Sequence, residues 1–252
     1  MRRTSDHRRR GTEDSGTEDS GTDGTGAGAR SGTGAGAGVG ARVGAGVGIR
    51  GLIAAERREL ADLLDGLRPE QWDEPSLCAG WRVREVAAHM STGFRHGLPT
   101  TLVELAKARG GLHRMTDRVA RRDADAHSTA RLAAFLRDNA YHPWTPPVGG
   151  LAAALGHDVV HGLDITVPLG IDRRVPEERL RVLFAGIRPR SLKFFGADID
   201  GVRLCADDLD WSYGDGQPVY GAAQDLLLVA YGRRLPAGRL RGEPSGRFTA
   251  AV

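Results

Sequence analysis

The chain has 252 residues, a formal net charge of +3 and 36 glycines that are unevenly placed. Fourteen of these glycines fall within the first fifty positions, where leucine, phenylalanine, tryptophan and tyrosine are absent. Such a segment buries too little apolar surface to offset the entropy lost when its backbone is ordered. The composition therefore excludes a hydrophobic core there, and residues 1–48 are predicted to be a disordered Gly/Ser/Thr-rich tail, either an inert linker or the product of a start codon assigned too far upstream.

Beyond residue 50, 27 lysines and arginines stand against 26 acidic residues. A specific nucleic-acid binder concentrates its basic residues on one face, so this near balance argues against such a partner. The basic run 7–10 could touch phosphates, but acidic residues follow it directly. No run approaches the ~18 apolar residues of a membrane helix, and two cysteines fit a reducing compartment. We predict a cytoplasmic protein without nucleic-acid or membrane partners.

Helical spacing of apolar residues begins at Ile49 and continues to Leu67, with leucines recurring every three or four positions. Ser128 is a natural N-cap for a later helix, and the segment YHPWTPP at 141–147 interrupts the pattern. Short connections between such helices favour antiparallel packing. The pattern predicts an antiparallel helical bundle over residues 49–170, whose further helical stretches cover about 81–90, 98–120, 128–140 and 149–168.

After Gly170 the pattern changes. Residues 176–195 have helical spacing. Residues 201–216 instead alternate in polarity like a β-hairpin, and Gly-Asp-Gly at 214–216 is a turn signal. Residues 220–234 return to helical spacing. The sequence therefore predicts a mainly α protein, in which a small α+β domain over residues 171–252 follows the bundle.

Two histidines stand out by their spacing. His157 and His161 are four apart on a predicted helix, so both imidazoles project from one face. This spacing suits two ligands of a tetrahedral zinc or similar ion, and His89 on the apolar stripe of another helix is the candidate third ligand. Three imidazoles would leave a coordination position open, as in catalytic sites. The alternative is three ordinary core or rim histidines, and Asp164 either orients His161 or faces water.

Three segments, in order, resemble the mycothiol-dependent maleylpyruvate isomerase family. Residues 76–90 read SLCAGWRVREVAAHM, similar to a family stretch that leads to a ligand histidine. Residues 157–170, HDVVHGLDITVPLG, resemble its second signature. Residues 217–234, QPVYGAAQDLLLVAYGRR, resemble the helix of the family's C-terminal domain that ends in Gly-Arg. The resemblance spans about 49–246 and implies a DinB-like, metal-binding four-helix bundle followed by a small α+β domain.

The resemblance also implies site residues. It assigns His89, His157 and His161 as ligands of a divalent metal, with zinc as first candidate and nickel, iron and manganese left open. The founding isomerase type carries a glutamate where this chain has His157, and a neutral imidazole there leaves the ion more electrophilic. The functional arginine of the family's C-terminal domain corresponds to Arg233. The alternative for Arg233 is a surface arginine near a helix C-terminus.

The implied chemistry is that of a thiol. The family uses mycothiol, and coordination to a divalent cation deprotonates a thiol whose free pKa is about 8.5. The metal-bound thiolate would attack a small electrophile, with Arg233 holding a carboxylate of substrate or thiol. Cys78 is expected to be a small buried side chain that seats Trp81.

We therefore predict a metal-dependent, mycothiol-using enzyme, a maleylpyruvate isomerase-like protein or a thiol S-transferase. Its partners would be a small-molecule electrophile and a low-molecular-weight thiol, and the protein would be a monomer or homodimer. The alternative is a non-catalytic metal-binding or sensor protein of the same fold.

Overall fold

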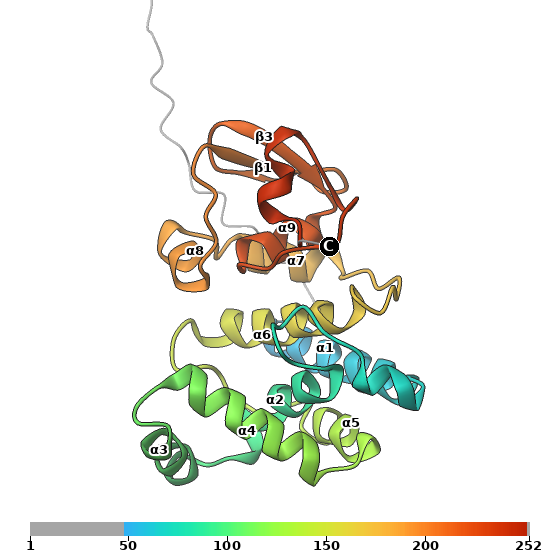
Figure 1. Cartoon of the computed structure of the whole chain (residues 1–252), viewed down its shortest axis with the longest axis vertical. Coiled ribbons are helices and arrows are strands. Elements are labelled where there is room, and N and C mark those ends of the chain that lie inside the picture. The colour runs from blue at the N-terminus through green and yellow to red at the C-terminus, as the bar shows by residue number, and fades with distance from the viewer. Residues whose placement is uncertain (1–47, 251–252) are drawn as a thin grey trace, which may run out of the picture. The chain divides into compact units, whose positions relative to one another are not determined.

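The computed structural model describes residues 48–250, and the predicted tail, apart from Gly48, lies outside the described residues. The fold is mainly helical, with a small mixed sheet near the C-terminus (Figure 1). Within residues 48–250, no helix is both long and apolar enough to cross a bilayer. The predicted fold class, a helical bundle followed by α+β structure, is confirmed.

The bundle is built mainly from four helices that pack against one another. Helices α1, α2, α5 and α6 form this group, and α4 packs along α2 (Figure 1). The elements of this part are α1 (Ile49–Asp65), η1 (Pro69–Asp73), α2 (Val83–Arg95), α3 (Leu98–Lys107), α4 (Leu112–Ala126), α5 (Thr129–Asp138) and α6 (Gly150–Thr166).

The single helix predicted over 98–120 is wrong, because the structure has two helices there. Arg109 and Gly110 between α3 and α4 take positive φ values of 50° and 73°. The left-handed region ends a helix, and glycine adopts it without steric cost. The sequence Arg-Gly-Gly at 109–111 was the local signal for this break.

The C-terminal part contains a four-stranded sheet in the order β2-β1-β3-β4. Strand β1 pairs antiparallel with β2, as the predicted hairpin requires, but parallel with β3. Residues 217–221 therefore form a strand, and the predicted helix over 220–234 begins only at Ala223. The helix predicted over 176–195 is also divided, before Pro189. The elements are α7 (Glu177–Phe184), α8 (Pro189–Phe195), β1 (Val202–Ala206), β2 (Ser212–Tyr213), β3 (Gln217–Gly221), α9 (Ala223–Ala230), β4 (Leu240–Arg241) and η2 (Glu243–Phe248).

The hydrophobic core continues from the bundle into the C-terminal part. One cluster of buried side chains joins Leu52 of α1 and Leu163 of α6 to Leu183 of α7 and Leu226 of α9. A second cluster, which includes Met90, fills the bundle. The predicted boundary at residue 170 lies in the connection between α6 and α7. Its division of the chain into separate domains stays a prediction, because apolar packing crosses this position.

A buried carboxylate on α4 anchors the end of α2 and gives a pH-dependent prediction. Asp123 accepts a hydrogen bond from Arg95 Nη2 at 2.6 Å and lies 2.8 Å from His96 Nε2. Burial alone raises the pKa of Asp123, but the hydrogen bonds from His96 and Arg95 outweigh it, so the pKa is lowered. A carboxylate with a depressed pKa stabilises the fold above its unfolded pKa of about 3.9, and this contribution disappears as the pH falls through the folded value.

We therefore expect Asp123→Asn to lower the free energy of unfolding at pH 7 by about 1.5–3 kcal/mol, the usual range for hydrogen bonds to a charged group. The difference from wild type should narrow as the pH falls below about 4. Urea unfolding at a series of pH values measures the stability difference between the two proteins. A difference that stays constant down to pH 2 would contradict the stabilising role of the ionised Asp123.

Candidate functional site

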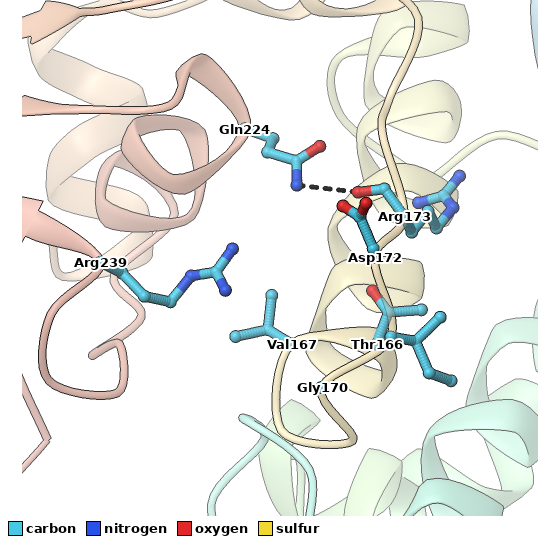
Figure 2. A pocket seen from close by; sticks show the side chains of 8 residues that line it. Thr166, Val167, Gly170, Asp172, Arg173, Gln224 and Arg239 are labelled. Atoms are coloured by element: carbon cyan, nitrogen blue, oxygen red, sulfur yellow. Dashed lines mark hydrogen bonds between the residues drawn. The ribbon is translucent and has the colours of Figure 1, made fainter.

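A cavity of about 190 Å³ lies beside the C-terminal end of α6, between residues 166–173 and the side chains of Gln224 and Arg239 (Figure 2). Gln224 Nε2 donates to the backbone oxygen of Arg173 at 2.9 Å, and Arg239 is paired with Asp225. None of the predicted site residues is among the described residues that line this cavity. Gln224 thus holds the loop after α6 to α9, and the predicted site residues lie outside this cavity.

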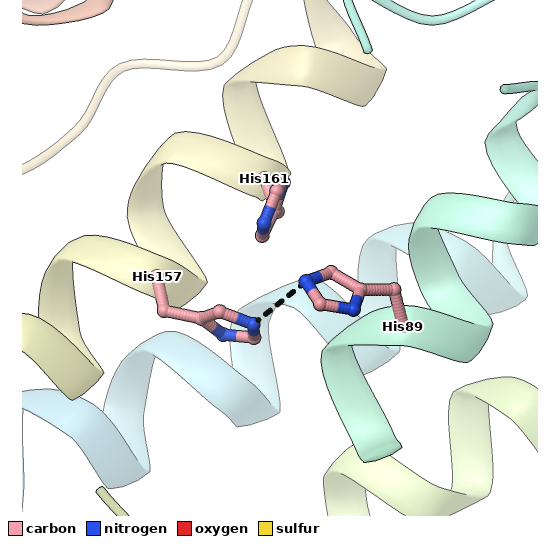
Figure 3. A group of neighbouring side chains, drawn as sticks. All are labelled: His89, His157 and His161. Atoms are coloured by element: carbon pink, nitrogen blue, oxygen red, sulfur yellow. Dashed lines mark hydrogen bonds between the residues drawn. The ribbon is translucent and has the colours of Figure 1, made fainter. Parts of the chain in front are cut away.

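The three predicted ligands do converge. His89 of α2 and His157 and His161 of α6 point toward one another in the space between the two helices (Figure 3). The Nε2 atoms of His157 and His89 are 3.3 Å apart. The ring centroids are separated by 4.8 to 5.0 Å, and one nitrogen of each ring lies within 4.8 Å of a nitrogen of both others. The four-residue spacing on α6 and the packing of α2 against α6 together produce this cluster.

The geometry and charge of the cluster fit a divalent metal. Two nitrogens bound at about 2.0–2.1 Å to one tetrahedral ion would be about 3.3 Å apart, which matches the distance between the Nε2 atoms of His89 and His157. Metal-binding imidazoles must be neutral. Burial, followed by the neighbouring imidazoles, lowers the pKa of His89, and burial lowers that of His161 against an opposing hydrogen bond from Asp164. Imidazole nitrogens are donors that suit zinc, nickel or iron.

Two buried aspartates orient the histidines of α6. Asp158 Oδ1 lies 2.9 Å from His157 Nδ1, and Asp164 Oδ2 lies 2.9 Å from His161 Nδ1. Both carboxylates are 0% exposed. An aspartate that accepts the Nδ1 proton leaves Nε2 as the free donor for an ion. The structure thus favours the orienting role for Asp164 over the solvent-facing alternative.

Arg233 joins the cluster through Asp164. Its Nε and Nη2 atoms donate to the two oxygens of Asp164 at 2.8 Å each, and Nη1 donates to the backbone oxygen of Tyr231 at 3.2 Å. Despite burial, the hydrogen bonds from Arg233 and His161 hold the pKa of Asp164 well below its usual range. The guanidinium therefore orients the carboxylate that orients His161. Its predicted contact with a substrate carboxylate stays a prediction.

Cys78 lies next to the same carboxylate. Its Sγ donates to Asp164 Oδ2 at 3.1 Å and is 3.7 Å from His161 Nδ1. Burial and the negative charge of Asp164 raise the pKa of this thiol far above its ordinary value. The thiol is therefore protonated at neutral pH and acts as a hydrogen-bond donor. The backbone oxygen of Cys78 accepts a hydrogen bond from the backbone nitrogen of Trp81 at 2.9 Å, which closes a turn between the two residues.

Two tryptophans flank the histidines. The Trp81 ring is 5.2 Å from that of His89, and the Trp144 ring meets His157 edge-on at 5.3 Å. Trp144 also lies so close to Gly93 of α2 that a Cβ there would be 2.0 Å from the indole ring. Glycine at this position is what admits the indole. Sequence reasoning treated Trp81 as packing and gave Trp144 no role, since nothing in YHPWTPP indicates which way the ring points.

Asp158 was also missed by sequence reasoning. It directly follows His157, and neighbouring side chains on a helix do not usually face each other. Its partner Arg57 is 101 residues away in the chain. No local pattern joins these two residues, so only the packed structure reveals them.

The fold and the cluster define a helical-bundle protein with three imidazoles between α2 and α6. Residues 53–166, which contain all three histidines, match the family model described as the mycothiol maleylpyruvate isomerase N-terminal domain. The chain therefore carries a domain of this kind, and the resemblance to the mycothiol-dependent maleylpyruvate isomerase family is confirmed.

Solved structures extend the similarity of fold beyond this domain. The crystal structures of the mycothiol-dependent maleylpyruvate isomerase and of a histidine-to-alanine mutant of it have TM-scores of 0.51 and 0.52. Each is 16% identical, and the match covers 78% of this chain and 92% of the other. Among curated proteins, none has a sequence that matches this chain.

Proposed function

We propose that this protein is a metal-dependent enzyme that uses mycothiol to transform a small electrophile, either by isomerisation, as in maleylpyruvate isomerase, or by transfer of the thiol. The observation that carries the proposal is the convergence of three imidazoles, two of them backed by buried aspartates. His89, His157 and His161 would hold the ion, with zinc as first candidate. When bound, a divalent cation lowers the pKa of a thiol that coordinates it and so supplies a thiolate at neutral pH.

The chain's own residues would orient and confine the reactants. Asp158 and Asp164 hold the imidazoles in the tautomer that presents Nε2. Arg233 is 23% exposed, and its guanidinium has N–H groups beyond those that Asp164 and Tyr231 accept. These would bind a carboxylate of the substrate or the thiol. The rings of Trp81 and Trp144 would limit the size of the electrophile.

Isomerisation and thiol transfer are both proposed because this chain has His157 where the founding isomerase type carries a glutamate. A third neutral ligand leaves more positive charge on the ion, which favours thiolate formation without specifying what the thiolate attacks. We also propose a cytoplasmic protein, where a reduced thiol is available, acting as a monomer or homodimer without nucleic acid.

The test compares metal-free protein with protein reconstituted separately with zinc, nickel, iron and manganese. Each form is mixed with mycothiol and either maleylpyruvate, whose isomerisation changes its ultraviolet absorbance, or a bimane electrophile that fluoresces on thiol transfer. We expect turnover of at least one substrate only when metal and mycothiol are both present, with glutathione as the control thiol. Stoichiometric metal without thiol-dependent turnover of either substrate would instead favour the non-catalytic metal-binding alternative.

A further inference from the structure

A fully buried ion pair lies behind His157. Arg57 of α1 donates from Nε to Asp158 Oδ2 at 2.8 Å, and both side chains are 0% exposed. The other oxygen of Asp158 lies 2.9 Å from His157 Nδ1. A continuous set of hydrogen bonds therefore runs from α1 through a carboxylate of α6 to one of the three imidazoles.

The same guanidinium also holds the segment that follows α5. Arg57 Nη1 donates to the backbone oxygens of Asn139 and His142 at 3.1 and 3.0 Å. The backbone nitrogen of Trp144 in turn donates to His142 Nδ1 at 3.1 Å, and the Trp144 ring lies against His157. Arg57 thus fixes both the hydrogen-bond acceptor of His157 and the backbone that carries the ring beside it.

Stability alone is a poor explanation for this pair. The desolvation of two buried charges often cancels their attraction, and an apolar pair of similar volume is commonly as stable. Arg57 Nη2 adds to the cost, since it is buried with no hydrogen-bond partner among the described residues. Orientation is the better explanation, because Arg233, Asp164 and His161 repeat the same arginine–aspartate–histidine order at the other histidine of α6.

We propose that Arg57 and Asp158 are positioning residues that fix the tautomer and orientation of His157 and hold Trp144 against it. That the ligand is a divalent ion rests on the proposed function. The hydrogen bonds among Arg57, Asp158 and His157 do not depend on that function, so they can be examined in the metal-free protein.

The principal variant is Arg57→Met combined with Asp158→Leu, which removes both buried charges together and avoids leaving one unpaired. In metal-free wild type, nitrogen-15 NMR of the imidazoles should show His157 protonated at Nδ1. In the double variant we expect the Nε2-protonated form to become populated. Cobalt(II) affinity, followed by the visible absorbance of the bound ion, should fall about 10–100-fold, as for other partners of metal-binding histidines.

Asp123→Asn is the matched control, since Asp123 is also a buried bundle carboxylate that holds an arginine and a histidine outside the cluster. It should change neither the His157 tautomer nor cobalt affinity. Arg57→Lys keeps the charge but lacks the planar guanidinium that directs Nε to Asp158 and Nη1 to the backbone oxygens, and it should give an intermediate loss. This single variant serves as the test if circular dichroism shows the double variant to be unfolded.

The positioning role would be overturned if the double variant folded and kept the wild-type tautomer of His157 and the wild-type cobalt affinity. It would also be overturned if Arg57→Lys matched the wild type in both measurements. Failure of the wild type to bind cobalt would instead count against the proposed function. The nitrogen spectra of the metal-free proteins would still decide the role of Arg57 and Asp158.

Discussion

His161→Ala is expected to lower the affinity for a divalent ion by more than about 100-fold, because losing only the hydrogen-bond partner of a ligand already costs about 10–100-fold. Thiol-dependent turnover should fall with it. His161 is the strongest target because its Nδ1 is held by Asp164 while its ring faces both His89 and His157. Elemental analysis after dialysis and calorimetric titration measure the loss.

Thermal unfolding provides a second readout of the same variant. An ion present at about 1,000 times its dissociation constant stabilises the native state by about 4.1 kcal/mol. Wild type should therefore melt at a higher temperature with metal than with chelator, and His161→Ala should not. His96→Ala is the control, because His96 follows α2 but is held by Asp123 outside the cluster. Equal metal content in wild type and His161→Ala would rule out the three-histidine site.

Arg233→Ala is expected to destabilise the protein by about 3 kcal/mol. Removing one partner of a buried ion pair typically costs about 3–5 kcal/mol. We expect the lower end because Arg233 is 23% exposed, so water can reach part of the space it leaves, although Asp164 is 0% exposed. This is a large share of a typical total stability of about 5–15 kcal/mol. Urea unfolding at pH 7 measures the difference.

The neighbouring Arg234 is the matched control for this prediction. It is exposed, so Arg234→Ala should change stability by no more than about 0.5 kcal/mol. Adding Asp164→Asn to Arg233→Ala should recover part of the loss, since the unpaired charge is then removed. A stable Arg233→Ala protein would show that Asp164 does not depend on this arginine and would limit Arg233 to a contact with substrate.

The sequence was informative where the relevant signal is local. Apolar residues at helical spacing located the bundle helices, and the four-residue separation of His157 and His161 placed two imidazoles on one face of α6. His89 needed the family resemblance as well, because an isolated histidine on an apolar stripe does not reveal its partner. The breaks at 109–111 and before Pro189 were visible as Gly and Pro signals but were outweighed by continuing apolar periodicity.

Non-local arrangements could not be predicted in this way. The parallel pairing of β1 with β3 joins strands whose connection contains β2, and no turn sequence specifies it. Residues 54–61, AAERRELA, have the composition of a solvated helix face, yet Glu56 and Arg57 are both 0% exposed. Their oppositely charged partners, Asp158 for Arg57 and Arg179 for Glu56, are more than a hundred positions away. The local sequence therefore gave no indication that Glu56 and Arg57 are buried.

The core that crosses residue 170 has a consequence for engineering this protein. Leu52 and Leu163 belong to the same buried cluster as Leu183 and Leu226, and Arg233 completes the surroundings of Asp164. The C-terminal part therefore cannot be replaced independently of the bundle. A chimera that takes this part from a relative would also have to take the matching faces of α1 and α6, and with them the helix that carries two of the three histidines.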